Sequence, residues 1–354
     1  MRARTSAILA ALGIVVLALG LYYGGGPAEQ TQQVATGQLL FPGLTPKLAE
    51  AAQVEIVHKG ATLHLRRTGT TADAVWGVAD RSDYPAQQGK VHEVLTALTD
   101  LRLDDARTSD PADYARLGVE DADGKGADST LLRVLDAKGG VIAALIVGHA
   151  RSAAHGGIDT LYVRRPGEAQ SWLADGRIAV TADAQDWLDR DIVNIDAAKI
   201  ATDTVTRGDA TLQFARKDGK LVLTAPADHP KLDDFKLEEV GRALSELNFD
   251  NVQKAPAPGT PLGRAVVTTT DGMTVTVDVS KSGPDIWATF AATGKDAAAL
   301  DARTKGWAYQ LGAWKEQTLV PSLDDLKLPE PKPAPAAAAP APAPAPAPAA
   351  PPAQ

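Results

Sequence analysis

The chain has 354 residues, of which 44% are hydrophobic, and it carries a formal net charge of −8 and no cysteine. That length suffices for two domains of ordinary size. The acidic balance, without a long run of Lys or Arg, argues against nucleic-acid binding. The lack of cysteine excludes thiolate metal sites, cysteine nucleophiles, disulfides and an acylated-cysteine anchor.

An uncharged apolar segment follows the first two arginines of the chain. Arg2 and Arg4 precede SAILAALGIVVLALGLYY, residues 6–23. As a helix this segment would span about 27 Å, close to the hydrocarbon thickness of a bilayer. Tyr22 and Tyr23 suit an interfacial aromatic belt, and the arginines should stay cytoplasmic. The pattern predicts one transmembrane helix.

The predicted topology places the body of the protein outside the cytoplasm. Residues 1–25 would form an uncleaved signal anchor, and residues 26–50 a linker. A cleaved signal peptide, with cleavage after Ala28, is the alternative.

The middle of the chain contains two similar series of predicted elements. ATLHLRR from Ala61 and ATLQFAR from Ala210 alternate apolar and polar residues, which is typical of half-buried strands. A strand follows each one, and later hairpins turn at Lys138–Gly140 and at Asp271–Gly272. These patterns predict an α+β fold, with two tandem copies of a largely antiparallel sheet, over residues 51–196 and 197–327.

One long amphipathic helix is expected in each copy, over residues 90–103 and 236–249. In KVHEVLTALTDLRLDDA and KLEEVGRALSELNFDNV, apolar residues recur on one helical face that can pack on a sheet. The opposite faces are polar, with His92, Glu93 and Asp100 in the first copy and Glu238, Glu239 and Glu246 in the second.

The stretch WLDRDIV raises the question of a catalytic charge cluster. It can be aligned with WKEQTLV, so that Trp187 matches Trp314. Asp189, Arg190 and Asp191 do not repeat, whereas the apolar frame does. We therefore expect a structural terminator, with both tryptophans packed over a sheet end and Arg190 paired with a carboxylate. A site specific to the first copy is the alternative.

These segments resemble a known protein family. VWGVADRSDYPAQQGKVHEVLTALTDLRLDD, then DYARLGV, LIVG, LYVRR and WLDRDIV, and finally GWAYQLGAWKEQTLV, are similar to the domain-of-unknown-function 4340 family over roughly residues 51–327. The resemblance implies a bacterial envelope protein that is anchored in the cytoplasmic membrane, has a periplasmic body and is associated with ABC-type transport components of the kind linked to gliding motility. It supplies no catalytic residue. GVEDADGKG departs from the family pattern by lacking an expected proline.

One acidic loop has part of a calcium-loop pattern. Asp121, Asp123 and Gly126 fit loop positions 1, 3 and 6. Lys125 at position 5 and Leu132 at position 12 do not fit, because calcium needs oxygen ligands there. A polar surface loop is the expected structure.

Histidines give the other candidate metal site. His149 and His155 share a loop with Asp159, which is a possible two-histidine, one-carboxylate set. Its spacing matches no helix-borne motif, so no metal or cofactor is predicted. His58 and His64 are expected on strand faces.

From Pro329 the chain is almost entirely Pro and Ala, which favours polyproline II, so residues 328–354 are expected to form a disordered tail. A solvated tail and a spacer toward another envelope component are both open.

Two functions remain after these steps. The first is a non-enzymatic accessory or scaffold subunit with permease-type membrane partners. The alternative is an extracytoplasmic glycan- or lipid-binding protein. Exposed tryptophans around one groove would favour sugar stacking, and buried ones would favour a scaffold. The residues that decide this are Trp76, Trp172, Trp287 and Trp307.

Overall fold

The computed structural model describes residues 37–69, 74–153 and 157–328. The predicted membrane anchor and residues 329–354 of the predicted tail lie outside these ranges. Among the helices of the described residues, none is long and apolar enough to cross a membrane.

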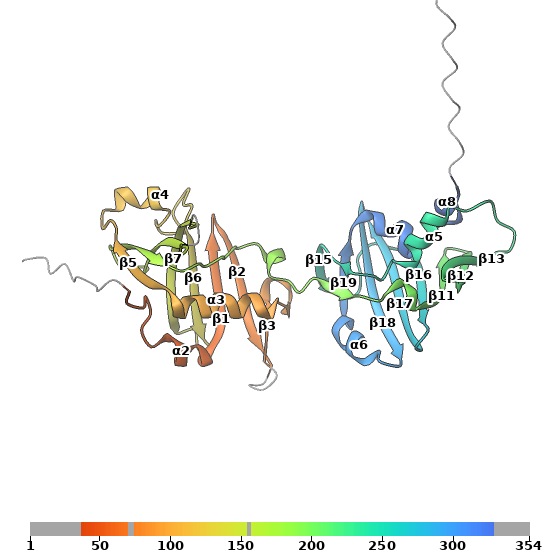
Figure 1. Cartoon of the computed structure of the whole chain (residues 1–354), viewed down its shortest axis with the longest axis horizontal. Helices are drawn as coiled ribbons and strands as arrows, with labels where there is room; N and C mark the ends of the chain where they lie inside the picture. Colours follow the sequence, from red (N-terminus) through yellow and green to blue (C-terminus); the bar gives the residue numbers. More distant parts are fainter. Residues whose placement is uncertain (1–36, 70–73, 154–156, 329–354) are drawn as a thin grey trace, which may run out of the picture. The chain divides into compact units, whose positions relative to one another are not determined.

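The chain divides into two compact units, Met1–Leu188 and Asp189–Gln354 (Figure 1). Each unit is built on one large sheet whose paired strands are antiparallel, with few helices. The fold is thus α+β-like, as the alternating sequence pattern predicts.

The sheet of the first unit has nine strands in the order β4-β3-β2-β1-β6-β7-β8-β9-β5. Apolar and polar residues alternate along most of them, so that one face is buried. Their bounds are β1 Ala51–His58, β2 Ala61–Thr68, β3 Val75–Val78, β4 Tyr84–Pro85, β5 Arg102–Ala106, β6 Thr130–Asp136, β7 Val141–Arg151, β8 Thr160–Arg164 and β9 Ser171–Asp175.

Helix α3 (Gln88–Asp100) crosses the first sheet (Figure 1). It buries Val91, Val94, Leu95 and Leu98, the face that the 3.6-residue periodicity predicts. The polar face stays exposed to solvent at His92, Glu93 and Asp100. Two shorter helices of this unit are α2 (Leu44–Lys47) and α4 (Tyr114–Leu117).

The sheet of the second unit has eight strands in the order β13-β12-β11-β16-β17-β18-β19-β15. Their bounds are β11 Ile200–Arg207, β12 Ala210–Lys217, β13 Lys220–Ala225, β15 Asn251–Lys254, β16 Thr260–Thr269, β17 Met273–Ser282, β18 Asp285–Gly294 and β19 Trp307–Leu311.

The two strand orders correspond, apart from the short edge strand β4. The first hairpin of each unit closes with a turn of two residues, between His58 and Ala61 and between Arg207 and Ala210. The pairing of β1 with β6 shifts register after Ala51, and that of β11 with β16 shifts at the corresponding residue, Ile200. The strands can therefore be compared residue by residue.

The helix of the second unit is shorter than the expected 236–249. Helix α5 covers Asp234–Gly241, and β14 (Leu247–Asn248) follows the turn after it. Gly241 lies within the predicted helix, and glycine costs a helix about 1 kcal/mol relative to alanine. The apolar face still packs, with Leu237 and Val240 buried. Three further helices are α6 (Ala298–Thr304), α7 (Glu316–Leu319) and α8 (Leu323–Leu326).

The linker predicted over residues 26–50 is wrong for its described part. Leu40 is fully buried, and its amide donates to Leu101 O at 2.8 Å. Leu39 forms a bridge with Arg102, directly after α3. Backbone hydrogen bonding thus makes Gly37–Leu40 part of the first unit.

The boundary between the units lies within WLDRDIV, not at residues 196 and 197. Leu188 forms a bridge with Ala86 and closes the first unit. Three residues later, β10 (Asp191–Val193) pairs with β14 of the second unit. This pairing repeats the role of Leu39, because each segment runs beside the residues that follow the helix of its own unit.

The sequence alignment of Trp187 with Trp314 is also wrong. Trp187 is fully buried and its carbonyl accepts from the amide of Gln87, which caps α3. In the second unit the carbonyl that accepts from the cap of α5, Asp233, belongs to Leu326. Leu326 therefore holds the position of Trp187, whereas Trp314 is 61% exposed. The matching tryptophans suggest an alignment of Trp187 with Trp314, whereas the hydrogen bonds align Trp187 with Leu326.

Candidate functional site

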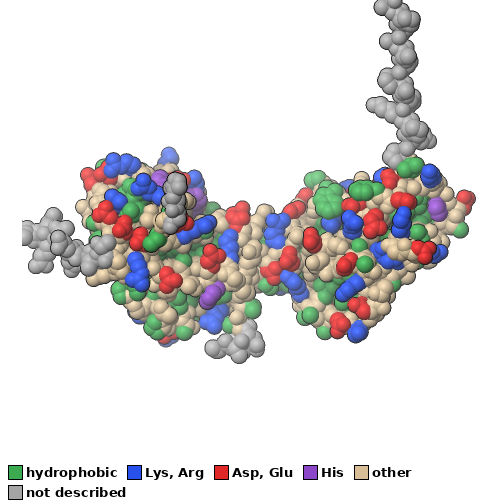
Figure 2. Space-filling view, viewed as in Figure 1, with side chains coloured by type: hydrophobic (Ala, Val, Ile, Leu, Met, Phe, Trp, Pro, Cys, Tyr) green, Lys and Arg blue, Asp and Glu red, His purple; other side chains and the backbone are tan. Residues whose placement is uncertain are grey.

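Charges of both signs are interspersed over the visible face of each unit (Figure 2). Lys and Arg side chains stand among Asp and Glu without forming one broad basic surface on that face. The candidate sites are therefore local clusters, which we take in turn.

Two of the three charged residues of WLDRDIV have a structural partner. Asp189 pairs with Arg303 at 2.9 Å. Arg190 Nε donates to Phe249 O at 2.7 Å, and its guanidinium pairs with Asp250 at 3.1 Å. The expected pairing of Arg190 with a carboxylate is confirmed. These contacts attach the start of the second unit to α6 and to the residues just before β15.

The acidic loop is organised around an arginine. Asp121 pairs at 2.5 Å with Arg164, whose side chain is 4% exposed. Arg164 Nε also donates to Val119 O at 2.7 Å, so the pair fastens the loop to β8. Leu132, at the last position of the calcium pattern, is buried in β6.

The histidine loop is only partly described. His155 lies outside the described residues, and Asp159 Oδ1 accepts from the backbone amide of Ala153 at 2.9 Å. Within the described ranges, no group of three or more His, Asp or Glu residues is placed to hold a metal ion. His64 lies on a strand, where it contacts Asp80 at 3.3 Å.

His149 belongs to a different cluster, which we call the first clamp: Lys59, Asp128 and His149. Asp128 lies between the other two, with Oδ1 2.6 Å from Lys59 Nζ and Oδ2 3.5 Å from His149 Nε2. The hydrogen bond from Lys59, with its charge, lowers the pKa of Asp128, and His149 contributes less. All three side chains are about half exposed, so the cluster is screened by solvent.

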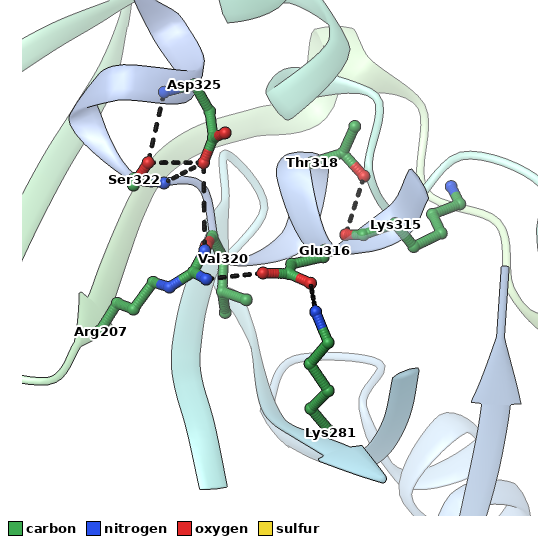
Figure 3. A network of polar contacts seen from close by, with 8 residues as sticks. All are labelled: Arg207, Lys281, Lys315, Glu316, Thr318, Val320, Ser322 and Asp325. Atoms are coloured by element: carbon green, nitrogen blue, oxygen red, sulfur yellow. Dashed lines mark hydrogen bonds and ion pairs between the residues drawn. The ribbon is translucent and has the colours of Figure 1, made fainter. Parts of the chain in front are cut away.

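A more enclosed arrangement lies at the corresponding end of the second sheet. We call it the second clamp: Arg207, Glu316 and Lys281 (Figure 3). Arg207 Nη2 donates to Glu316 Oε1 at 2.6 Å, and Lys281 Nζ donates to Oε2 at 2.8 Å. The hydrogen bond from Lys281 is the main reason that the pKa of Glu316 is lowered, and Arg207 adds to it. The glutamate side chain is 18% exposed.

Helices α7 and α8 are joined through the same arginine. Arg207 Nη1 donates to Val320 O at 3.1 Å and lies 3.9 Å from Asp325 Oδ2. Asp325 in turn accepts from the amide and the hydroxyl of Ser322, which caps α8 (Figure 3). One guanidinium thus links β11 to the segment that closes the unit.

The clamps use corresponding strand positions. His58 and Arg207 end β1 and β11, and His149 and Lys281 each lie two residues beyond corresponding valines of β7 and β17. His58 contacts Thr130 Oγ1 at 3.1 Å and is not itself part of the first clamp. The sequence did not reveal either clamp, because Asp128 and Glu316 come from loop and helix segments that do not correspond.

A buried carboxyl of the second unit was also missed. Asp203 in β11 is 4% exposed, and its Oδ1 has no hydrogen-bond partner among the described residues. It pairs across the sheet with Phe214 and Val267, so burial raises its pKa to about 7. The corresponding residue of β1 is Val54. The sequence IATDTVTR contains the evidence for this buried carboxyl, because the aspartate stands at a position where the alternating pattern puts a side chain on the buried face.

Two cavities of the second unit have largely apolar linings. One, of about 460 Å³, is lined by Val205, Leu212, Pro226, Pro321 and Leu323, and Arg207 is the only charged residue that the described part of the chain contributes to it. The other, of about 510 Å³, contains Phe290 and Trp307. Lys254 Nζ covers the ring of Trp307 at 3.4 Å from its centroid.

The tryptophans do not gather around one groove. Trp287 and Trp307 are buried, and Trp76 and Trp172 are half-buried. In the first sheet, β3 and β9 are separated by five strands, which places Trp76 and Trp172 about 29 Å apart. One sugar ring, a few ångströms across, cannot stack on both Trp76 and Trp172.

Comparison with known proteins gives one family. No curated protein and no solved structure matches the chain. Residues 76–264 match the family described as a domain of unknown function, DUF4340. The match begins in β3 of the first unit, ends in β16 of the second, and covers more than half of the 354 residues. The chain therefore belongs to the DUF4340 family.

Proposed function

We propose that this protein acts by contact and not by catalysis, as an accessory or scaffold subunit of an ABC-type transport or motility-like membrane complex. The observation that carries the proposal is the second clamp. A general acid or base needs a free proton-transfer position facing a substrate. Both oxygens of Glu316 accept from cations of the same unit, and Arg207 also holds the backbone of Val320.

The first clamp and the WLDRDIV residues support the same proposal. Asp128, Asp189 and Arg190 each hold loops or strand ends of their own unit. Such contacts position the backbone. Charged groups that are already paired within the unit are less available to bind a substrate.

The tether remains part of the proposal. Residues 6–23 would anchor the chain in the bacterial cytoplasmic membrane and hold both units on the periplasmic side. The two units would be copies of one ancestral module, which the corresponding strand orders support. A reporter fused after residue 30 is expected to be active outside the cytoplasm, and recovery of the mature chain as a soluble periplasmic protein would contradict the anchor.

Photo-crosslinking in native membranes tests the contact function. A photoreactive residue at Glu93, on the exposed polar face of α3, should capture an integral membrane protein. The same residue at Asp209, in the tight turn between β11 and β12, serves as the control. If both positions yield only the uncrosslinked chain, and turnover of an envelope substrate is found instead, the scaffold proposal fails.

Lipid binding is the second candidate, and the cavity at Arg207 favours it. An apolar space of about 460 Å³ suits an acyl chain. Native mass spectrometry of the purified chain should then show bound lipid that Leu212→Trp removes. For glycans, the separated and covered tryptophans give no comparable support.

A further inference from the structure

The two sheets differ at the edge where β4 lies in the first unit. There β4 adds to β3, whereas β13, the counterpart of β3, is the last strand on its side of the second sheet (Figure 1). Within the described residues, β13 pairs with β12 alone. An edge strand of this kind presents unpaired backbone groups to which another strand can add.

The first unit shows which backbone groups such an added strand would use. The amide of Trp76 donates to Gln88 Oε1 at 2.8 Å, and its carbonyl accepts from the amide of Ala86 at 2.8 Å. The carbonyl of Val78 accepts from the amide of Asp83 at 3.0 Å. Trp76 and Val78 therefore point peptide groups away from β2, and their own unit satisfies these groups.

The corresponding residues of β13 are Leu221 and Leu223, because the two hairpins share one register. Lys217 and Lys220 face each other across a two-residue turn and form a hydrogen-bonded pair. By alternation, the peptide groups of Leu221 and Leu223 point away from β12. Among the described residues, no backbone hydrogen bond reaches these outward groups. They are the groups that an added strand would bind.

The segment that forms β4 has a counterpart that leaves the edge of β13 unpaired. Asp83–Pro85 reads DYP, and Asp228–Pro230 reads DHP at the same distance beyond its strand. Tyr84 is 1% exposed and belongs to β4. His229 is exposed, and its Nδ1 contacts Pro230 O at 2.9 Å. The described part of the second unit therefore supplies no strand at this position.

We propose that a second copy of the chain occupies this edge, through an antiparallel pair of β13 strands related by a two-fold axis at Val222. In this register Leu221 of each copy faces Leu223 of the other, and each such pair can exchange both of its N–H···O bonds. The contact uses the same surface on both copies, so it closes as a dimer and does not propagate into a fibre. It does not rest on the proposed scaffold function.

The sequence of β13, KLVLTA, is suited to pairing with itself. Its only charge is Lys220, at one end of the strand. The two-fold register sets Lys220 opposite Thr224 of the other copy, so the two ammonium groups lie at opposite ends of the contact and do not face each other. A register shift makes Thr224 an extra residue of the strand, which confines regular pairing to the residues around Val222.

Single cysteines test the register, because the chain has no cysteine of its own. In the full-length chain, Val222→Cys would set two thiols in a non-hydrogen-bonded pair, with Cα atoms about 4.5 Å apart and within the range of a disulfide. Lys220→Cys is the matched control on the same strand, since its two copies would be separated by about 13 Å along the strands.

Oxidation of the two variants with copper–phenanthroline, followed on non-reducing gels, gives the comparison. We expect the linked dimer to form about tenfold faster from Val222→Cys than from Lys220→Cys, because only the first pair lies within disulfide range. Equal rates for the two variants, or no linked dimer from Val222→Cys, would overturn the proposal.

Charge variants at the same position separate pairing from a failure to fold. Val222 is half-buried, and the two-fold axis places its side chain opposite its own copy. In analytical ultracentrifugation of the full-length chain in mild detergent, the parent should sediment as a dimer. Val222→Lys alone and Val222→Glu alone should sediment as monomers, since like charges then face each other. An equal mixture of the two variants should recover the dimer, which misfolded chains could not do. A monomeric parent, or a mixture that stays monomeric, would contradict the two-fold pairing.

Discussion

The first unit and the second unit have corresponding sheets but different interiors at two places. Where β1 carries Val54, β11 carries the buried carboxyl of Asp203. Where the first unit is closed by the ring of Trp187, the second is closed by the smaller Leu326 and by the clamp of Glu316. Strand order is thus maintained by alternation and turns, while the residues that close the sheet are free to differ.

The largest effect should come from the closing residue of the first unit. Trp187→Ala removes a fully buried ring that also donates from Nε1 to Thr181 O at 2.9 Å. We expect a loss of about 3–5 kcal/mol in the free energy of unfolding. Hydrogen exchange followed by mass spectrometry should locate the loss in residues 37–188. The matched variant Leu326→Ala should act on the second unit, and the reverse assignment would contradict the alignment of these residues.

The next effect concerns Asp203 and has a defined pH dependence. Burial raises its pKa from 3.8 to about 7, so the folded unit keeps a proton that the unfolded chain releases. Stability is therefore lost as the pH rises from about 4 to about 7. Asp203→Val, which installs the residue found at Val54, should stabilise the second unit by about 2–4 kcal/mol at pH 8 and by much less at pH 4.

Urea denaturation at the two pH values measures this difference. Asp203→Asn serves as the control, because it removes the titration and keeps a polar group in the core. A pH-independent gain for Asp203→Val would show that folding does not raise the pKa of this carboxyl.

Glu316 should show the opposite pH dependence with a smaller size. Its pKa is lowered, chiefly by the hydrogen bond from Lys281, so its contribution is present above the unfolded value of 4.5 and lost as the pH falls through the folded value. Glu316→Gln should cost about 1–2 kcal/mol at pH 7. A double-mutant cycle with Lys281→Met measures the coupling, which should fall toward zero at acidic pH.

The smallest effect is expected at Trp314. Because its ring lies on the surface, Trp314→Ala should change the free energy of unfolding by less than about 0.5 kcal/mol. The contrast with Trp187 is the point of the measurement, since the sequence pattern assigned both tryptophans the same role. A loss of several kcal/mol would restore that alignment.

Much of the sheet architecture could be predicted from the sequence. Strands such as Ala61–Thr68 and Ala210–Lys217 follow from alternation, and the turn at Gly272 from hairpin chemistry. These features depend on neighbours in the chain. The pairing of Asp191–Val193 with residues after α5 is fixed only by folding, and so was assigned to the wrong unit.

The clamps could not be predicted for the same reason. Arg207 and Glu316 are 109 positions apart, and no sequence pattern links them. Asp203 is different, because the alternation in the sequence shows its inward position in the strand. It was overlooked because carboxylates are usually found on the surface.

The closing hydrogen bonds also bear on how the protein folds. The backbone amide of Gln87, at the N-cap of α3, donates to the carbonyl of Trp187. The amide of Asp233, at the N-cap of α5, donates to the carbonyl of Leu326. Each unit is therefore completed by a contact between residues about a hundred positions apart, and contacts of such long sequence separation raise the contact order and slow folding. During synthesis neither sheet can be sealed until the last residues of its own unit have emerged, so a chain interrupted shortly before Leu188 or Leu326 leaves an open edge.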